Sequence, residues 1–326
     1  AGEFVWDSAN VGHAARLELR LGRGRGVRVG GRLYDEVGAV EEWQLGEGET
    51  GLAAFFAHRD YRDYYGRHGG AAYVAFHATA DAHLTLSLAD QRWSAREVRD
   101  PFTLFRNGAA WRPNPRVDEG RMHVATATAR IDTRNDEANP WSGWYLVLDY
   151  ERGTGDVTSF APRSADLVSG AGGPRAPGRL TYGRGFLDLR RYNRLSPEAR
   201  LDMRLVAGGW LHGDALPLQR RFSVTGPGAL AGFDFRRPVS PTNDVGQCSV
   251  AGAEPAGSPA QCERFAMAQV ELRGDLRFGL FEDDDDDRWR WRGIDLDGSW
   301  VLFADAGRGW LVGRRAGDLA YPSDAF

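Results

Sequence analysis

The sequence predicts an all-β fold, and specifically a single transmembrane antiparallel β-barrel that spans residues 1–326. Apolar and polar residues alternate with a period of two along many segments, and clusters of turn-forming residues separate these segments. Many segments are about 9 to 11 residues long or longer, the length that a tilted strand needs to cross a bilayer. The 42 Gly, 11 Trp, 16 Phe and 10 Tyr residues also favour β structure over helix.

Three segments show the alternation most clearly. Leucine occupies every second position of 17–21 and 84–88, with charged or hydroxyl-bearing residues between. In 144–150, Trp144 and Tyr150 lie at the two ends of an apolar face. Aromatic residues at both ends of such a face are typical of a strand whose ends meet the two membrane interfaces. Further strands are expected at about 27–35, 38–46, 51–60, 71–79, 121–133, 178–190, 200–212, 264–278, 289–297 and 299–312.

Long polar loops are expected at about 97–120, 153–177 and 214–262. Such inequality between long loops and short turns is typical of a barrel with long loops at one rim. The longest loop contains several prolines and both cysteines, so much of it is neither strand nor helix. A loop of this length usually has a function or is disordered.

Net charge excludes few classes of protein. The chain has 41 basic and 45 acidic residues, so no global field favours nucleic acid as a partner. No stretch of about 18 uncharged apolar residues occurs, which excludes a transmembrane helix but is compatible with a transmembrane barrel. Charges on the polar side of predicted strands either line a wet conduit or form cross-strand pairs. These charged residues are Arg16, Glu18, Arg20, Asp149 and Glu151.

The two cysteines, Cys248 and Cys262, lie within the longest loop. A local pair in a chain otherwise without cysteine suits the oxidising cell envelope, and the two could form a disulfide or remain free thiols. The chain begins at Ala1 without an initiator methionine or a signal peptide, and Pro322 breaks the alternation near its end. We therefore expect it to be part of a longer barrel protein.

Five segments in a fixed order resemble one known family. They are the motif 60–69, the turn-rich hairpin 132–143, the Gly-rich segment 216–233, the Val-Glu-Leu-Arg strand at 270–273, and the Phe-Ala-Asp-Ala-Gly segment at 303–307. Together they resemble the outer-membrane assembly and bacterial surface antigen superfamily, which includes the Bam and Tam assembly barrels. Each motif is short, and only the ordered combination is specific.

The resemblance implies a barrel of sixteen strands, of which about twelve to fourteen are visible here, with a long loop that enters the lumen. We expect the family's periplasmic docking domains to be absent from this chain. In the family an arginine at the loop tip pairs with an acidic residue of the wall, but Ala231 occupies that position, and Arg236 or Arg237 could substitute. The implied loop tip comprises Gly228, Leu230, Ala231, Gly232 and Phe233. The implied docking residues of the wall are Glu271, Arg273, Phe303, Asp305 and Gly307.

By the same resemblance, the chain would insert or export client proteins in the bacterial outer membrane. Its partners would be the lipid bilayer, unfolded outer-membrane or secreted clients, and periplasmic accessory proteins, with no nucleic acid. Three alternatives remain: a passive pore, the membrane barrel of a lipolytic (patatin-like) fusion protein, and a soluble all-β binding or carbohydrate-active domain.

The sequence does not favour an enzyme. It contains neither a Gly-x-Ser-x-Gly motif nor metal-binding histidine spacing, so no cofactor, metal or catalytic residue is predicted. A Ser-His pair on the barrel wall, with His77 or His123 as base, is the weaker alternative. The glycines of 226–232 lack phosphate-loop spacing. The acidic run 282–287 suits a solvated hairpin tip or, alternatively, Ca²⁺.

Overall fold

The computed structural model describes residues 2–6, 11–22, 25–96, 102–106, 108–111, 114, 117–158, 177–232, 262–280 and 294–310. Several predicted features lie outside these residues. They are Phe233, Arg236, Arg237, Cys248, the acidic run 282–287, and the parts of the last two predicted strands at 289–293 and 311–312.

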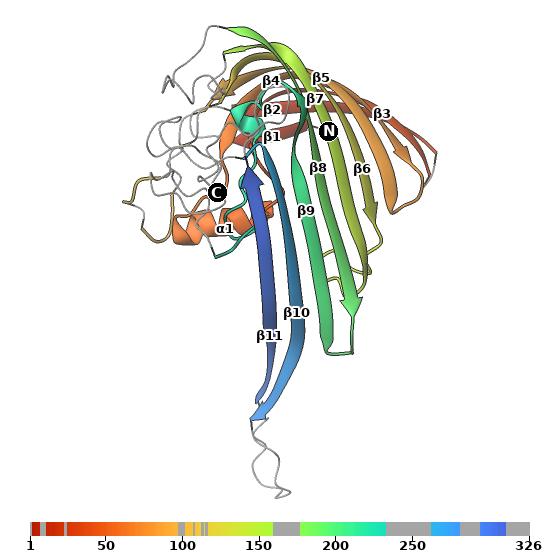
Figure 1. The fold of residues 1–326 in the computed structure, drawn as a ribbon, viewed down its shortest axis with the longest axis vertical. Helices are drawn as coiled ribbons and strands as arrows, with labels where there is room; N and C mark the ends of the chain where they lie inside the picture. The colour runs from red at the N-terminus through yellow and green to blue at the C-terminus, as the bar shows by residue number, and fades with distance from the viewer. Residues whose placement is uncertain are drawn as a thin grey trace, which may run out of the picture.

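The described residues form one antiparallel sheet of eleven strands, and the strands pair in sequence order (Figure 1). The strands are β1 Gly2–Trp6, β2 Val11–Leu21, β3 Gly26–Ala39, β4 Tyr64–His77, β5 Ala82–Ala95, β6 Glu119–Asp132, β7 Gly143–Thr158, β8 Gly178–Arg194, β9 Ala199–Gly213, β10 Arg264–Leu280 and β11 Ile294–Trp310. Within the described part of the chain, β1 pairs only with β2 and β11 only with β10. The all-β antiparallel prediction is therefore confirmed, with eleven described strands in place of twelve to fourteen.

Two predicted strands, 38–46 and 51–60, are wrong. β3 ends at Ala39, and the chain then forms helix α1, Glu47–Ala57. The segment Leu-Ala-Ala-Phe-Phe-Ala does not alternate and consists largely of residues compatible with a helix. The N–H of Gly46 donates 3.0 Å to the Glu49 carboxylate at the start of α1, and His58 ends it with a left-handed backbone, φ 52°.

Two further corrections concern the ends of the sheet. The strands predicted at 289–297 and 299–312 are joined in one strand, β11, which runs without a break past Gly298. β1 was missed because its five residues are too few to show a period. In addition, β7 continues to Thr158, so residues 153–158, which were predicted to belong to a loop, are part of the strand.

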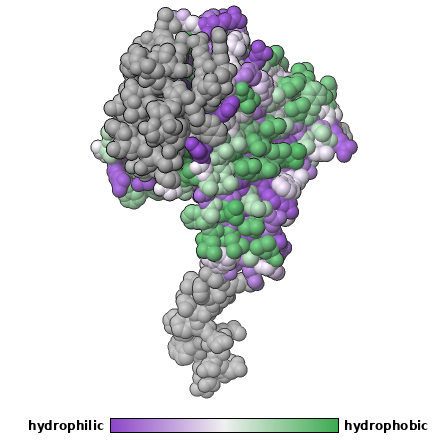
Figure 2. All heavy atoms as spheres, in the orientation of Figure 1, coloured by the Kyte–Doolittle hydropathy of each residue, from purple (hydrophilic) through white to green (hydrophobic). Residues whose placement is uncertain are grey.

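The sheet has one apolar and one polar face. The apolar face carries large side chains that the protein leaves exposed. Figure 2 shows broad hydrophobic areas on the face in view, with hydrophilic residues beside them. We call these residues the outer belt: Leu17, Leu19, Leu21, Val29, Leu33, Phe76, Leu84, Leu86, Leu88, Ile131, Leu148, Met203, Leu205, Val270 and Leu302. The strand register keeps them in continuous rows, for example Phe76 opposite Leu84 and Met203 opposite Val270. An apolar surface with exposed side chains on nine strands needs an apolar partner, because soluble monomers rarely expose so much.

The two rims differ as predicted. Four-residue turns join β2 to β3, β4 to β5 and β8 to β9 at one rim, where the ten-residue hairpin 133–142 joins β6 to β7. Long connections join β3 to β4, β5 to β6, β7 to β8 and β9 to β10 at the other, which we call the long-loop rim. None of the described helices is long and apolar enough to cross a membrane.

Candidate functional site

The connection after β9 turns back against the inner face of the sheet. We call residues 214–232 the inward loop. Its side chains are among the most buried in the structure: Leu216, Gln219 and Ala229 are fully buried, and Arg221 is 1% exposed. A short 3₁₀ turn, Leu218–Arg220, lies at its centre. Because so many polar groups are buried here, each needs a partner inside the protein.

Arg220 anchors the inward loop to the wall. Its guanidinium donates 2.9 Å to Glu151 of β7 and 2.7 Å to the hydroxyl of Tyr65 on β4, and it lies over the ring of Trp93. Glu151 is 7% exposed and also accepts a 2.6 Å hydrogen bond from the Tyr182 hydroxyl. This arrangement gives a buried carboxylate several donors at once, as such a group requires.

Two other side chains fix the approach to this anchor. Arg221 lies 3.6 Å from the carboxylate of Glu263, which also accepts the N–H of Leu216 at 3.1 Å. The Gln219 amide donates to the carbonyl of Asp118 at 2.9 Å and accepts its N–H at 3.0 Å. The inward loop is therefore joined both to the start of β10 and to the β5–β6 connection.

Arg204 of β9 organises the second half of the inward loop. Its guanidinium donates 2.9 Å to Asp188 of β8, 3.0 Å to the carbonyl of Trp43 and 3.3 Å to the carbonyl of Gly228. Trp43 also lies 5.1 Å from the ring of Phe265 in a stacked arrangement. One arginine thus joins the wall, the β3–α1 connection and the inward loop.

The β3–α1 connection packs directly on the inward loop. The Gln44 amide donates 2.9 Å to the carbonyl of Ser223, and the N–H of Ser223 donates 2.9 Å to Glu41. Gly228 approaches Gln44 so closely that a Cβ there would lie within 3.0 Å of the Gln44 carbonyl oxygen. Glycine is required at this position for space.

The predicted loop tip is only partly held by the predicted wall residues. Leu230 lies beside Gly307 of β11, and the carbonyl of Ala229 accepts 2.9 Å from Gln269 of β10. Ala231 and Gly232 are exposed, and Gly232 has no atom near its Cβ position. The charged contact expected at the tip lies instead at Arg220.

The other predicted wall residues take different positions. Glu271 and Arg273 pair with each other along β10, and Arg273 also lies 3.5 Å from Asp202. Phe303 is opposite Glu271 in the register and 66% exposed, and Asp305 is opposite Gln269. Arg204, Asp188 and Gln269, which the sequence did not single out, contact the loop or its supports in their place.

Charged side chains of the inner face pair with one another around a cavity. Arg16 pairs with Glu18, and the hydroxyl of Tyr73 donates 2.6 Å to the same carboxylate. Glu36 is held by Arg32 and Arg67 at 2.5 and 2.7 Å. These side chains line a cavity of about 530 Å³ that reaches Arg220. Both expectations for inner charges, polar lining and cross-strand pairing, therefore apply.

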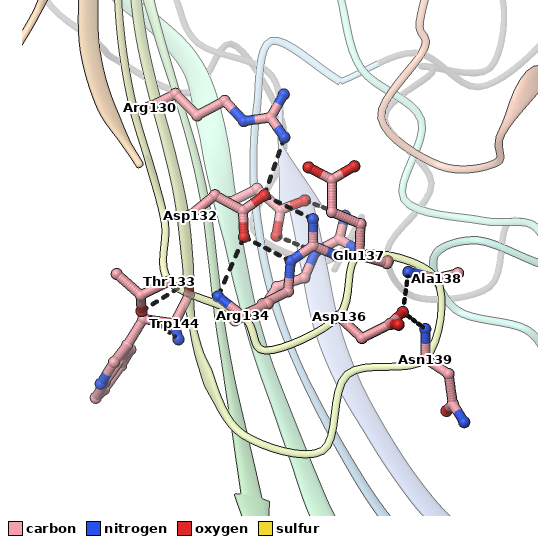
Figure 3. Close-up of polar contacts among 11 residues, drawn as sticks. Arg130, Asp132, Thr133, Arg134, Asp136, Glu137, Ala138, Asn139 and Trp144 are labelled. Carbon is pink, nitrogen blue, oxygen red and sulfur yellow. Dashed lines mark hydrogen bonds and ion pairs between the residues drawn. The ribbon is translucent and has the colours of Figure 1, made fainter. Parts of the chain in front are cut away.

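The hairpin between β6 and β7 is ordered by its own side chains (Figure 3). Asp132 accepts hydrogen bonds from Arg134 at 2.7 and 2.8 Å, and Asp136 accepts the N–H groups of Ala138 and Asn139. Arg200 of β9 donates 2.8 Å to the carbonyl of Pro140, which fastens the hairpin to the neighbouring turn. The backbone donors hold the pKa of Asp136 below its ordinary value.

No catalytic arrangement occurs in the part of the chain that the structure describes. His77 lies against His83 at the β4–β5 turn, and His123 faces outward near Asp90, neither bonded to a serine. The described residues contain no group of three metal-binding side chains. Cys262 is buried and disulfide-bonded, and Cys248 lies outside the described residues.

Fold and loop together define a curved antiparallel sheet of barrel type with a segment docked inside it. No family model and no curated protein matches the chain. Among solved structures, the chain is similar to BamA from Haemophilus ducreyi lacking POTRA domains 1–3, with a TM-score of 0.50 and 12% identity over 92% of this chain. The chain spans 50% of that protein's length. The likeness confirms the expected fold, that of a BamA-type β-barrel.

Proposed function

We propose that this chain is the membrane-embedded barrel of a bacterial outer-membrane factor that inserts or exports client proteins, and that it acts without catalysis. The carrying observation is the inward loop, which docks on the inner wall of a BamA-type sheet through Arg220 and Glu151. A passive pore needs no segment held this firmly across its interior.

The outer belt supports a place in the lipid bilayer. Its leucines face away from the protein, while charges on the inner face are paired. Lipid would cover the leucines without desolvating a polar group. Pairing between strands would satisfy the hydrogen bonds of the backbone N–H and C=O groups. The outer membrane is the location that suits such a barrel.

The edge strands would supply the working surface. Among the described strand pairings, β11 pairs only with β10. The backbone N–H and C=O groups along its other edge are therefore available to a further strand. A client strand could add to that edge by β-augmentation, with backbone hydrogen bonds giving affinity without sequence specificity.

Reconstitution tests this proposal. The 326-residue chain in liposomes should accelerate the folding of a small urea-unfolded outer-membrane barrel, measured by the mobility shift of the folded client in unheated gels. A photo-crosslinking residue in place of Val301, on β11, should capture the client. The same residue in place of Leu86 should not, although the two positions are 41% and 40% exposed.

The opposite results have a definite meaning. Steady ionic conductance with no acceleration of client folding would assign the chain to passive pores. A chain that stays folded and monodisperse without detergent or lipid would contradict the membrane assignment altogether.

A further inference from the structure

A groove crosses the outer face of β2 to β8 and has a volume of about 1250 Å³. Its floor is formed by small residues, among them Ala15, Gly31, Gly70, Ala72 and Ala125. Three leucines of the outer belt, Leu17, Leu33 and Leu88, stand along it. The groove is therefore hollow because alanine and glycine form its floor and the larger leucine side chains stand beside them.

The leucines of the groove are uncovered by the protein. Leu17, Leu33 and Leu88 are 74%, 70% and 67% exposed. At Gly70 a Cβ would lie 2.9 Å from the Leu33 side chain, so glycine leaves room for that leucine. An elongated apolar chain laid along the groove would bury these surfaces at about 25 cal/mol per Å².

Polar residues also line the groove: Arg16 and Arg32 at its β2–β3 end, Asp90 and His123 near its middle, and two arginines at its β7–β8 end, toward the long-loop rim. Arg152 and Arg179 line it, with Thr154 and Thr181 between them in the strand register and their hydroxyls 3.0 Å apart. Both arginines are exposed, and neither makes a hydrogen bond or ion pair with a residue that the structure describes. Asp156 is opposite Arg179 in the register and is the acidic residue of that row.

Arg121 provides a contrast on the adjacent strand. It is also exposed on this face, but Asp90 accepts both arms of its guanidinium, at 2.8 Å for Nε. Neither Arg152 nor Arg179 is paired in this way with a carboxylate of the described residues, Asp156 included. Their guanidinium groups are available to an oxyanion from outside the chain.

We propose that this groove binds one membrane lipid with a phosphate headgroup, its acyl chain along the leucines and its phosphate at Arg152 and Arg179. The apolar length of the groove selects a lipid over free phosphate, since a free ion would leave the leucines uncovered. The arginines and threonine hydroxyls supply donors that match phosphate oxygens. This site rests on the membrane embedding in the proposed function but needs no client.

Lipid titration followed by native mass spectrometry tests the site. The detergent-solubilised 326-residue chain is titrated with dioleoylphosphatidylglycerol, dioleoylphosphatidylcholine or dioleoylglycerol. We expect one phosphatidylglycerol to be retained at least about tenfold more tightly than dioleoylglycerol, because each guanidinium–phosphate contact is charge-assisted. The Arg152→Gln/Arg179→Gln variant should lose this preference, and Arg121→Gln should keep it.

Filling the groove provides an independent variant. Ala125→Leu should weaken the binding of all three lipids, since it occupies the floor and leaves the arginines in place. Inorganic phosphate at millimolar concentration should not displace the lipid. Equal retention of phosphatidylglycerol by wild type and the double arginine variant would overturn the proposal. So would a dimer that Ala125→Leu abolishes, because a second copy of the chain would then occupy the groove.

The failure of this site and of the proposed function can be told apart. A barrel that inserts into liposomes and accelerates client folding, yet shows no lipid preference, contradicts only the lipid site. A chain that does not enter liposomes contradicts both.

Discussion

The guanidinium of Arg220 donates a 2.9 Å hydrogen bond to the carboxylate of Glu151, and both side chains are less than a tenth exposed. The two residues belong to the inward loop and to β7, so this contact is one of those that hold the loop against the wall. The family resemblance placed such an ion pair at the loop tip, where Ala231 cannot form it. The chain has the same kind of anchor earlier in the same loop.

Arg220→Ala should release the inward loop. Removing one partner of a buried ion pair costs about 3–5 kcal/mol, because the other charge stays buried without compensation. We expect cleavage of the loop by proteinase K to become at least about 100-fold faster, since each step of about 1.4 kcal/mol in that free energy is a factor of ten. Arg220→Lys should restore protection only in part, since an ammonium lacks the planar fork that reaches Glu151 and Tyr65 together.

Arg20→Ala is the matched control for this measurement, because Arg20 is an exposed arginine of β2. Its cleavage rate should equal that of the wild type. If Arg220→Ala left the loop as protected as in wild type, the anchor assigned to Arg220 would be wrong.

Gly228→Ala should separate the inward loop from the β3–α1 connection. An added Cβ would collide with the carbonyl of Gln44, so one of the two segments must move. Amide hydrogen exchange in the peptide that covers residues 40–46 should become faster. Gly232→Ala, where a Cβ meets nothing within 4 Å, should leave that exchange unchanged. Equal exchange in the two variants would show that the close approach at Gly228 does not hold the segments together.

The sequence predicted the strands better than the site because the two depend on different information. The alternation in 84–88 arises because the two faces of a strand meet different surroundings, and each residue reports its own face. This signal is local and can be read from the sequence. Helix α1 was missed because its apolar run was assigned to a strand although it does not alternate, and Gly46 and Glu49 gave the signal for a helix start.

Contacts across the interior join segments that are far apart in the sequence, and the alternation along a strand does not show which of these segments meet. Arg220 and Glu151 are 69 positions apart, and Arg204 and Trp43 are 161 apart. The motif of the loop favoured its tip at 228–233, whereas the buried ion pair of the described residues lies at Arg220, in the middle of the loop. The available signal was the pair Arg220-Arg221 within an otherwise apolar and Pro-flanked segment, since buried charges need partners.

Asp136 should titrate below the ordinary aspartate value of 3.8, because the N–H groups of Ala138 and Asn139 donate to its ionised carboxylate. A depressed pKa in the folded state means that this contribution to the turn is present above pH 3.8 and is lost as the pH falls through the lower, folded value. The carboxyl carbon shift in a ¹³C NMR titration measures the midpoint, and Asp136→Asn assigns the signal. A midpoint at or above 3.8 would contradict the hydrogen-bonded turn.

Arg204 and Asp188 should be energetically coupled, since Arg204 donates to Asp188 at 2.9 Å and the two are 15% and 5% exposed at their side chains. Asp188 also binds Arg190 at 2.7 Å, so a single loss at Arg204 leaves the carboxylate one partner. A double-mutant cycle with Arg204→Gln and Asp188→Asn should give an interaction free energy of about 1–3 kcal/mol, as expected for residues in direct contact. Urea unfolding of the detergent-bound chain supplies the four free energies.

Arg204→Gln should in addition speed hydrogen exchange at 40–46, because the guanidinium of Arg204 also holds the carbonyl of Trp43. Additive effects within about 0.3 kcal/mol would contradict the coupling of Arg204 to Asp188, and unchanged exchange at 40–46 would contradict the hold of Arg204 on the β3–α1 connection.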